Sequence, residues 1–189
     1  MRSTLATLLW SDAKRPRAFA SLRTTTWRLK DAGLGPWLDV QHEQVGFREG
    51  SPVRLDVHQF FGYLDECRRH GHPPQAVCTD CLPLLGAAAE LYRSNFMQGL
   101  SLRGAVVFDD WQTSQAELLR NQASGMLERL VSGYQKQNDL TQAIHYARQW
   151  LTIDRMNEET HCQLMTCLLY KSDAADELLC AALVGRVIL

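Results

Sequence analysis

Apolar side chains recur at helical spacing along most of the chain, and one short N-terminal segment alternates instead. Residues 3–10 and 17–32 carry leucines and threonines three and four positions apart, which predicts two short amphipathic helices. The inner face of the second helix would carry Leu22, Thr25, Thr26 and Leu29. The opposite face would then be polar and face the solvent.

Two strand-like runs follow these helices. Residues 37–41 (WLDVQ) and 44–49 (QVGFRE) alternate apolar and polar positions and are separated by a short polar turn. This pattern predicts a β-hairpin. Residues 53–57 (VRLDV) alternate in the same way and predict a third short strand.

From residue 56 onward the spacing is helical. The predicted helices are 56–69, 81–100, 109–137, 140–151 and 158–169. In the fourth of these, Ala143, Ala147 and Leu151 recur every four residues. Small side chains at such positions let antiparallel helices approach closely, as in tetratricopeptide-like (TPR-like) repeats. The sequence therefore predicts a mainly α protein whose second part is all-helical.

Charge adds a second feature to this pattern. The first 30 residues contain seven Lys and Arg residues but only one acidic residue, Asp12, although the whole chain has a net charge of −1. The outer face of the predicted helix 17–32 would carry Arg17, Thr24, Trp27 and Arg28, with Arg23 and Lys30 on its flanks. A nucleic-acid-facing surface and an ordinary solvated helix face both fit this distribution.

The order of two helices, a hairpin and a helical region resembles a known family. Residues 17–60 resemble the end of the winged DNA-binding domain of bacterial activators of the antibiotic-regulatory-protein (SARP-like) type. Residues 91–99 (LYRSNFMQG) resemble the Leu-Tyr-x-Gly-x-Phe-x-x-Gly stretch of the bacterial transcriptional activation domain, with Ser94 where glycine is usual. Residues 138–165 are similar to its TPR-like hairpin. Together the resemblance covers about residues 3–169.

The resemblance implies a transcriptional regulator. Residues 1–50 would be a partial winged helix-turn-helix (two helices and a hairpin wing), and residues 57–169 a TPR-like activation domain. Double-stranded DNA would be one partner, and the transcription machinery or a second copy of the chain another. The residues expected at the DNA are Arg17, Arg23, Thr24, Trp27, Arg28, Lys30 and His42, the last in a wing at 41–44. Arg and Lys release counterions from phosphates, and Arg also pairs with guanine.

The sequence also departs from the family. The small sheet and first helix that open its DNA-binding domain are missing, so we expect the chain to start inside that domain. Thr26 stands where leucine is usual, which weakens the inner helix face. Residues 167–177 (CLLYKSDAADE) resemble translated sequencing-adapter read-through, so we expect residues 170–189 to be an atypical, artefactual tail. The alternative is an ordinary divergent C-terminal helix.

Residues 67–81 (CRRHGHPPQAVCTDC) concentrate metal-binding side chains. Cys67 and His70 form one paired-ligand step, and Cys78 and Cys81 form another. Such spacing predicts a closed tetrahedral Cys3His site for a structural zinc ion, with His72 as an alternative ligand. The competing interpretation is that the cysteines pack as small hydrophobic side chains at two helix ends.

Other chemistry is weakly represented. No combination of residues suggests a nucleophile, a base and an oxyanion hole, and no phosphate-binding Gly-x-x-x-x-Gly-Lys motif occurs. We therefore expect a protein that is not an enzyme.

No signal peptide and no apolar run of about 20 residues is present, so we expect a cytoplasmic protein without membrane contact. The alternative function is a TPR-like protein-interaction scaffold that does not bind DNA.

Overall fold

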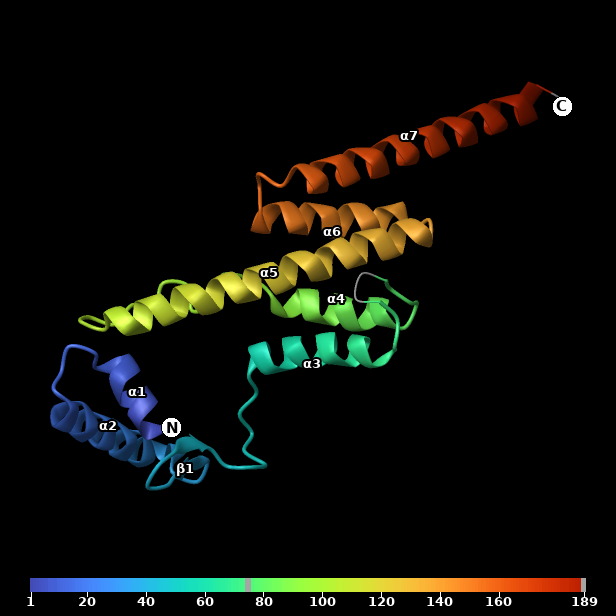
Figure 1. Ribbon diagram of the computed structural model, residues 1–189. Coiled ribbons are helices and arrows are strands. Elements are labelled where there is room, and N and C mark those ends of the chain that lie inside the picture. The colour runs from blue at the N-terminus through green and yellow to red at the C-terminus, as the bar shows by residue number, and fades with distance from the viewer. Residues whose placement is uncertain (74–75, 188–189) are drawn as a thin grey trace. The chain divides into compact units, whose positions relative to one another are not determined.

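The computed structural model describes residues 1–73 and 76–187, with side chains up to residue 172. This part of the chain is mainly helical, as predicted, and forms two compact units. The first unit combines Met1–Leu55 with Ser94–Leu119, and the second combines Asp56–Arg93 with the chain from Arg120 onward. Helix α5 (Val106–Lys136) contributes residues to both units. Figure 1 shows the order of the elements along the chain.

The first unit is built on the packing of α1 (Arg2–Leu9) against α2 (Arg15–Leu29). The buried stripe of α2 consists of Ala18, Leu22 and Thr26, four residues apart, and its Ala18 and Leu22 pack with Ala6 of α1. Because Ala18 has a small side chain, it leaves room for the neighbouring helix.

The predicted inner face of α2 was therefore partly wrong. Thr25 is exposed and Leu29 is 37% exposed, because the stripe follows the contact with α1 and includes Ala18 instead. Thr26 is buried, and its hydroxyl donates to the carbonyl oxygen of Leu22 at 2.9 Å. This hydrogen bond removes most of the cost of burying a hydroxyl where leucine would pack.

The hairpin prediction is confirmed. A π-helical segment, η1 (Lys30–Leu34), follows α2 and contains Gly33 at φ 92°, a conformation that ends helices and suits glycine. Strand β1 (Leu38–Val40) then pairs antiparallel with β2 (Val45–Phe47). Within residues 1–55 the structure describes no further strand, so the prediction of a strand at 53–57 was wrong.

Helix α3 (Asp56–Arg69) begins where that strand was expected. The Asp56 carboxylate accepts a hydrogen bond from the backbone N–H of Val57 at 2.7 Å. A negative charge in the first turn also favours a helix N-terminus. Alternation over five residues was too short a pattern to outweigh this helix start signal.

The second unit contains two helical hairpins, which Figure 1 shows as neighbouring helices. Helix α3 packs on α4 (Cys81–Leu91), and α6 (Leu140–Ile153) packs on α7 (Glu158–Val187). The core between them is apolar and includes the fully buried Leu85, Met126, Leu127, Leu130 and Val131. Ala143 and Ala147 are also fully buried, as their spacing predicted.

Polar contacts fix the register of these helices. The indole N–H of Trp150 on α6 donates to the hydroxyl of Ser124 on α5 at 2.6 Å. The side-chain amide of Gln149 donates to the backbone carbonyl of Ala89 on α4 at 3.1 Å. Each bond satisfies a polar group that the packing of α6 would otherwise isolate from water.

Several predicted boundaries were wrong. The helix expected at 81–100 ends at Leu91, because Tyr92 leaves the helical conformation with ψ 85°. The chain then turns, with Met97 at φ 49° and Gly99 at φ 83°. On α7, Cys162 is exposed, whereas Cys167 is fully buried. Helix α7 continues past residue 169, where the predicted helix ended. Most of the tail expected at 170–189 lies outside the described side chains, which end at residue 172.

The close approach of α5 to α4 gives a test of the packing in the second unit. A Cβ at Gly133 would lie 2.6 Å from Cδ2 of the buried Leu82, whereas a Cβ at Gly125, also on α5, meets no atom within 4 Å. Alanine is favoured over glycine in a helix by about 1 kcal/mol, but overpacking a core costs about 1–3 kcal/mol. We therefore expect G125A to raise the free energy of unfolding and G133A to lower it. Urea unfolding followed by circular dichroism checks both, and equal stabilisation by the two variants would contradict this packing.

Candidate nucleic-acid interface and metal centre

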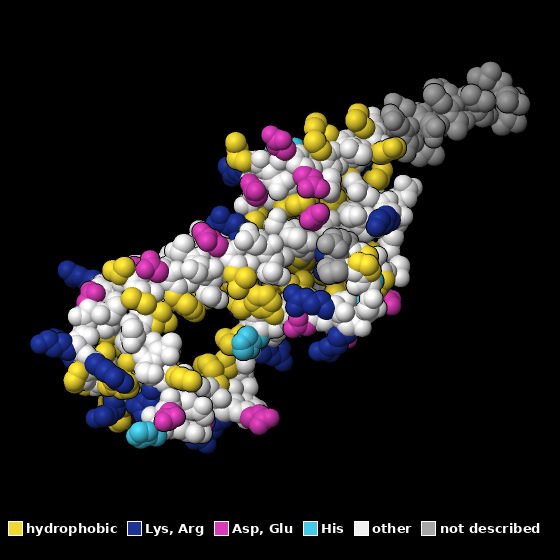
Figure 2. Space-filling view, in the orientation of Figure 1, with side chains coloured by type: hydrophobic (Ala, Val, Ile, Leu, Met, Phe, Trp, Pro, Cys, Tyr) yellow, Lys and Arg dark blue, Asp and Glu magenta, His cyan; other side chains and the backbone are white. Residues whose placement is uncertain are grey.

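The residues expected at the DNA are all exposed to solvent. They are Arg17, Arg23, Thr24, Trp27 and Arg28 on α2, Lys30 in η1, and His42 in the turn between β1 and β2. Trp27 is 64% exposed, which is unusual for the largest apolar side chain. Figure 2 shows Lys and Arg side chains at the surface of this first unit.

The arginines of this face are not neutralised internally. Among the described side chains the ion pairs are Arg68 with Asp65 and Arg69 with Glu66, both within α3. Neither Arg17 nor Arg28 takes part in an ion pair within this described part of the chain. Their charge therefore remains available to an external anion, although exposure alone also fits a solvated face.

One contact limits what Thr24 can do. Its hydroxyl donates to the carbonyl oxygen of Ala20 at 3.1 Å, one turn earlier in the helix. The hydroxyl proton is thus engaged by the backbone, while the residue as a whole is exposed. Thr24 is suited to an apolar contact more than to a hydrogen bond.

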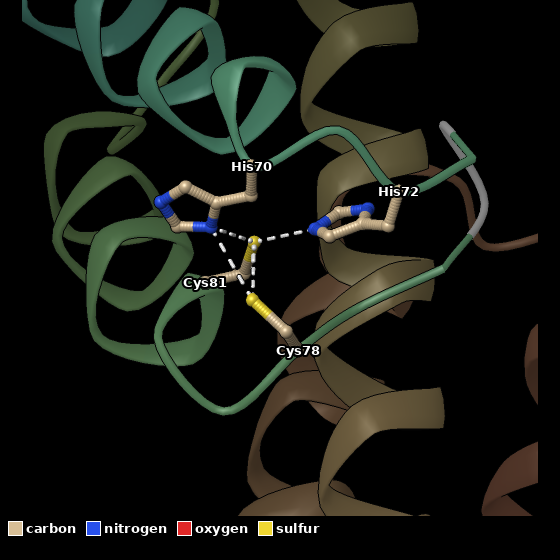
Figure 3. A group of neighbouring side chains, drawn as sticks. All are labelled: His70, His72, Cys78 and Cys81. Carbon is tan, nitrogen blue, oxygen red and sulfur yellow. Dashed lines mark hydrogen bonds between the residues drawn. The ribbon is translucent and has the colours of Figure 1, made fainter.

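A second cluster of functional side chains lies between α3 and α4. The possible ligand atoms of His70, His72, Cys78 and Cys81 all lie within 4.8 Å of one another, and this group could hold a metal ion. Figure 3 shows the two imidazole rings and the two sulfur atoms pointing toward a common centre. His70 directly follows α3, and Cys81 is the first residue of α4, so the two helix ends bring them together.

The individual distances are short. Nδ1 of His70 lies 3.3 Å from the sulfur of Cys78 and 3.2 Å from that of Cys81. Nε2 of His72 lies 3.0 Å from the Cys81 sulfur, and the two sulfurs are 3.5 Å apart. Cys81 is buried and His70 is exposed, so the cluster extends from the core to the surface.

Cys67 has a different environment. It is fully buried, and its thiol donates to the backbone carbonyl oxygen of Cys81 at 3.9 Å. The group whose ligand atoms converge contains His72 and not Cys67. The sequence spacing favours Cys67 as the fourth ligand and gives His72 only as an alternative. The distances in the folded chain favour His72.

The two thiols of the cluster differ in acidity. Desolvation acts to raise the pKa of Cys78, but hydrogen bonds from Cys81 and His70 to its thiolate outweigh it and lower the pKa to about 6. Desolvation, together with the hydrogen bonds to Cys78 and Cys67, raises the pKa of Cys81 to about 12. At neutral pH one thiolate and one thiol therefore share the site.

Comparison with known proteins identifies the helical part of the chain. The family described as "Bacterial transcriptional activator domain" matches residues 55–179, which include α3, α4, all of α5, α6 and the first part of α7. The chain belongs to this family. No curated protein matches the chain, and no solved structure matches it either.

Family membership confirms the resemblance that the sequence suggested for the activation domain. The match begins at residue 55, at the end of the N-terminal segment of the first unit, and so does not extend over α1, α2 or the hairpin. Among the helices of the described residues, none has the length and the apolar composition of a membrane-spanning segment.

The lowered pKa of Cys78 predicts its reactivity in metal-free protein. Alkylating reagents attack the thiolate, and an ordinary cysteine has a pKa of about 8.5. Because the pKa of Cys78 is about 6, its thiolate persists above that pH and is lost as the pH falls through it. Peptide mapping after brief iodoacetamide treatment should show Cys78 labelled at pH 7 and half-labelled near pH 6. The exposed Cys162 reports general accessibility, and a Cys78 midpoint above pH 8 would contradict the assignment.

Proposed function

We propose that this chain is a DNA-binding transcriptional regulator. Helix α2 and the β1–β2 turn contact double-stranded DNA, and the helical unit makes protein contacts. The observation that carries the proposal is the exposed basic face of α2, free of internal ion pairs within the described residues, in a chain that belongs to a transcriptional activator family.

The chemistry of this face suits a major groove. A helix fits into that groove, where Arg can bond to O6 and N7 of guanine and a threonine methyl can contact the methyl of thymine. Arg17, Thr24 and Arg28 are exposed on one short helix and provide these groups. Arg23 and Lys30 would neutralise flanking phosphates, and His42 in the turn would reach the adjacent groove in the manner of a wing.

The second unit offers a surface for protein partners. A groove of about 790 Å³ is lined by α4, α6 and α7 residues, including Glu90, His145 and Gln149. Met165, Leu169 and Tyr170 on α7 are each more than half exposed. Exposed apolar side chains beside a groove are typical of protein-interaction sites. The partner would be the transcription machinery or a second copy of the chain, and the role is regulatory rather than enzymatic.

Removing charge from α2 tests the DNA contact. The full chain is mixed with a fluorescent duplex of mixed sequence, and affinity is measured by anisotropy at several salt concentrations. We expect R17A/R28A to bind at least about tenfold more weakly than the unaltered chain, because each lost arginine contact costs about 1–3 kcal/mol. The dependence of affinity on salt should also become shallower, since fewer counterions are released.

The matched control is R68A/R69A, which removes two exposed arginines from α3 that already have acidic partners. This variant should bind DNA as the unaltered chain does. If the unaltered chain does not bind, or if both double variants lose affinity equally, α2 is not a DNA-reading helix. The first of these results would leave a TPR-like interaction scaffold as the function of the chain.

A further inference from the structure

We propose that His70, His72, Cys78 and Cys81 form a closed tetrahedral zinc site that links the end of α3 to the start of α4. The site is distinct from the proposed DNA contact and does not depend on it. Its ligand set differs from the Cys3His set that the sequence favours, because His72 takes the place of Cys67.

The spacing of the four side chains matches the size of the ion. With Zn–S bonds of about 2.3 Å and Zn–N bonds of about 2.0 Å, a tetrahedral ion spaces its ligand atoms roughly 3.3–3.8 Å apart. Four contacts in the cluster, three between a ring nitrogen and a sulfur and one between the two sulfurs, span 3.0–3.5 Å. The remaining pairs of ligand atoms lie within 4.8 Å of one another, so placing all four atoms on one ion requires movements of up to about 1 Å.

The surroundings of His72 give an independent indication. Its Nδ1 lies 3.1 Å from the backbone carbonyl oxygen of Pro73, which can only accept a hydrogen bond. The proton of the neutral ring is therefore on Nδ1, and the lone pair of Nε2 points at the Cys81 sulfur. Metal-binding histidines usually donate their second ring N–H to a carbonyl oxygen in this way, which orients the ligating nitrogen.

Charge favours two cysteine ligands over three. Two thiolates and two neutral imidazoles balance Zn²⁺, whereas a third thiolate would leave a net negative charge. Cys67 is fully buried, and an uncompensated charge there would be costly. As a neutral thiol it can keep its hydrogen bond to the carbonyl oxygen of Cys81, directly behind the site.

The donor set also identifies the ion and its role. Two thiolates and two imidazoles in a tetrahedral arrangement are typical of zinc. Four protein ligands leave no open position, so the ion would stabilise the fold rather than activate water. It would close the segment between His70 and Cys81 and hold together the ends of the first helical hairpin of the second unit.

Metal analysis of the full chain, purified without a polyhistidine tag, tests the site. We expect about one zinc ion per chain after dialysis. When Co²⁺ replaces zinc, the cobalt should change from pink to blue and show thiolate-to-metal charge-transfer bands, as a tetrahedral site with cysteine ligands does. C78S and H72A should lose the ion, while H72C should retain it with an additional thiolate band. Circular dichroism of each variant separates loss of the ligand from loss of the fold.

Three variants are matched controls. C67S tests the alternative ligand, C162S removes an exposed thiol, and H58A removes an exposed histidine from α3. All three should keep the ion. The proposal is overturned if the unaltered chain carries no stoichiometric metal, including the case in which Cys78 and Cys81 are found joined as a disulfide. It is also overturned if C67S loses the ion while H72A keeps it, because that result assigns the Cys3His set.

Discussion

The inner stripe of α2, made of Ala18, Leu22 and Thr26, determines which side chains of that helix remain in water. Once this stripe packs on α1, the helical period leaves Arg17, Trp27 and Arg28 at the surface. Thr26 belongs to the stripe because its hydroxyl is satisfied by the backbone of its own helix. The proposed contact with DNA therefore depends on an apolar contact on the opposite side of α2.

The second unit depends on a different constraint, the pairing of helices through small and buried residues. Ala143 and Ala147 let α6 pack closely, and Gly133 lets α5 approach Leu82 of α4. The match to the bacterial transcriptional activator domain, over residues 55–179, includes most of this unit together with Ser94–Leu119 of the first unit. The proposed zinc ion would also stabilise the packing of neighbouring helices, because it would hold α3 and α4 together at one end.

Much of this organisation follows from local sequence signals. The helices, the hairpin and the exposed arginines follow from spacings of two, three and four residues, which the backbone geometry imposes directly. Most of the failures concern contacts that form only in the folded chain. The face of α2 shifted toward Ala18 because α1 packs there, and the strand expected at 53–57 overlapped the correctly predicted start of α3 at Asp56. Spacing also could not decide between Cys67 and His72, since only the folded loop orients the ring of His72 toward Cys81.

The central claim, that the exposed face of α2 meets the phosphates and base edges of DNA, is tested most directly by chemical protection of arginine. The full chain is treated with phenylglyoxal with and without duplex DNA, and modification of each arginine is quantified by mass spectrometry. We predict that bound DNA protects Arg17, Arg23 and Arg28 from modification, while Arg68 and Arg69 react equally with and without DNA. Equal modification of Arg17 and Arg28 in the presence and absence of bound DNA would contradict it.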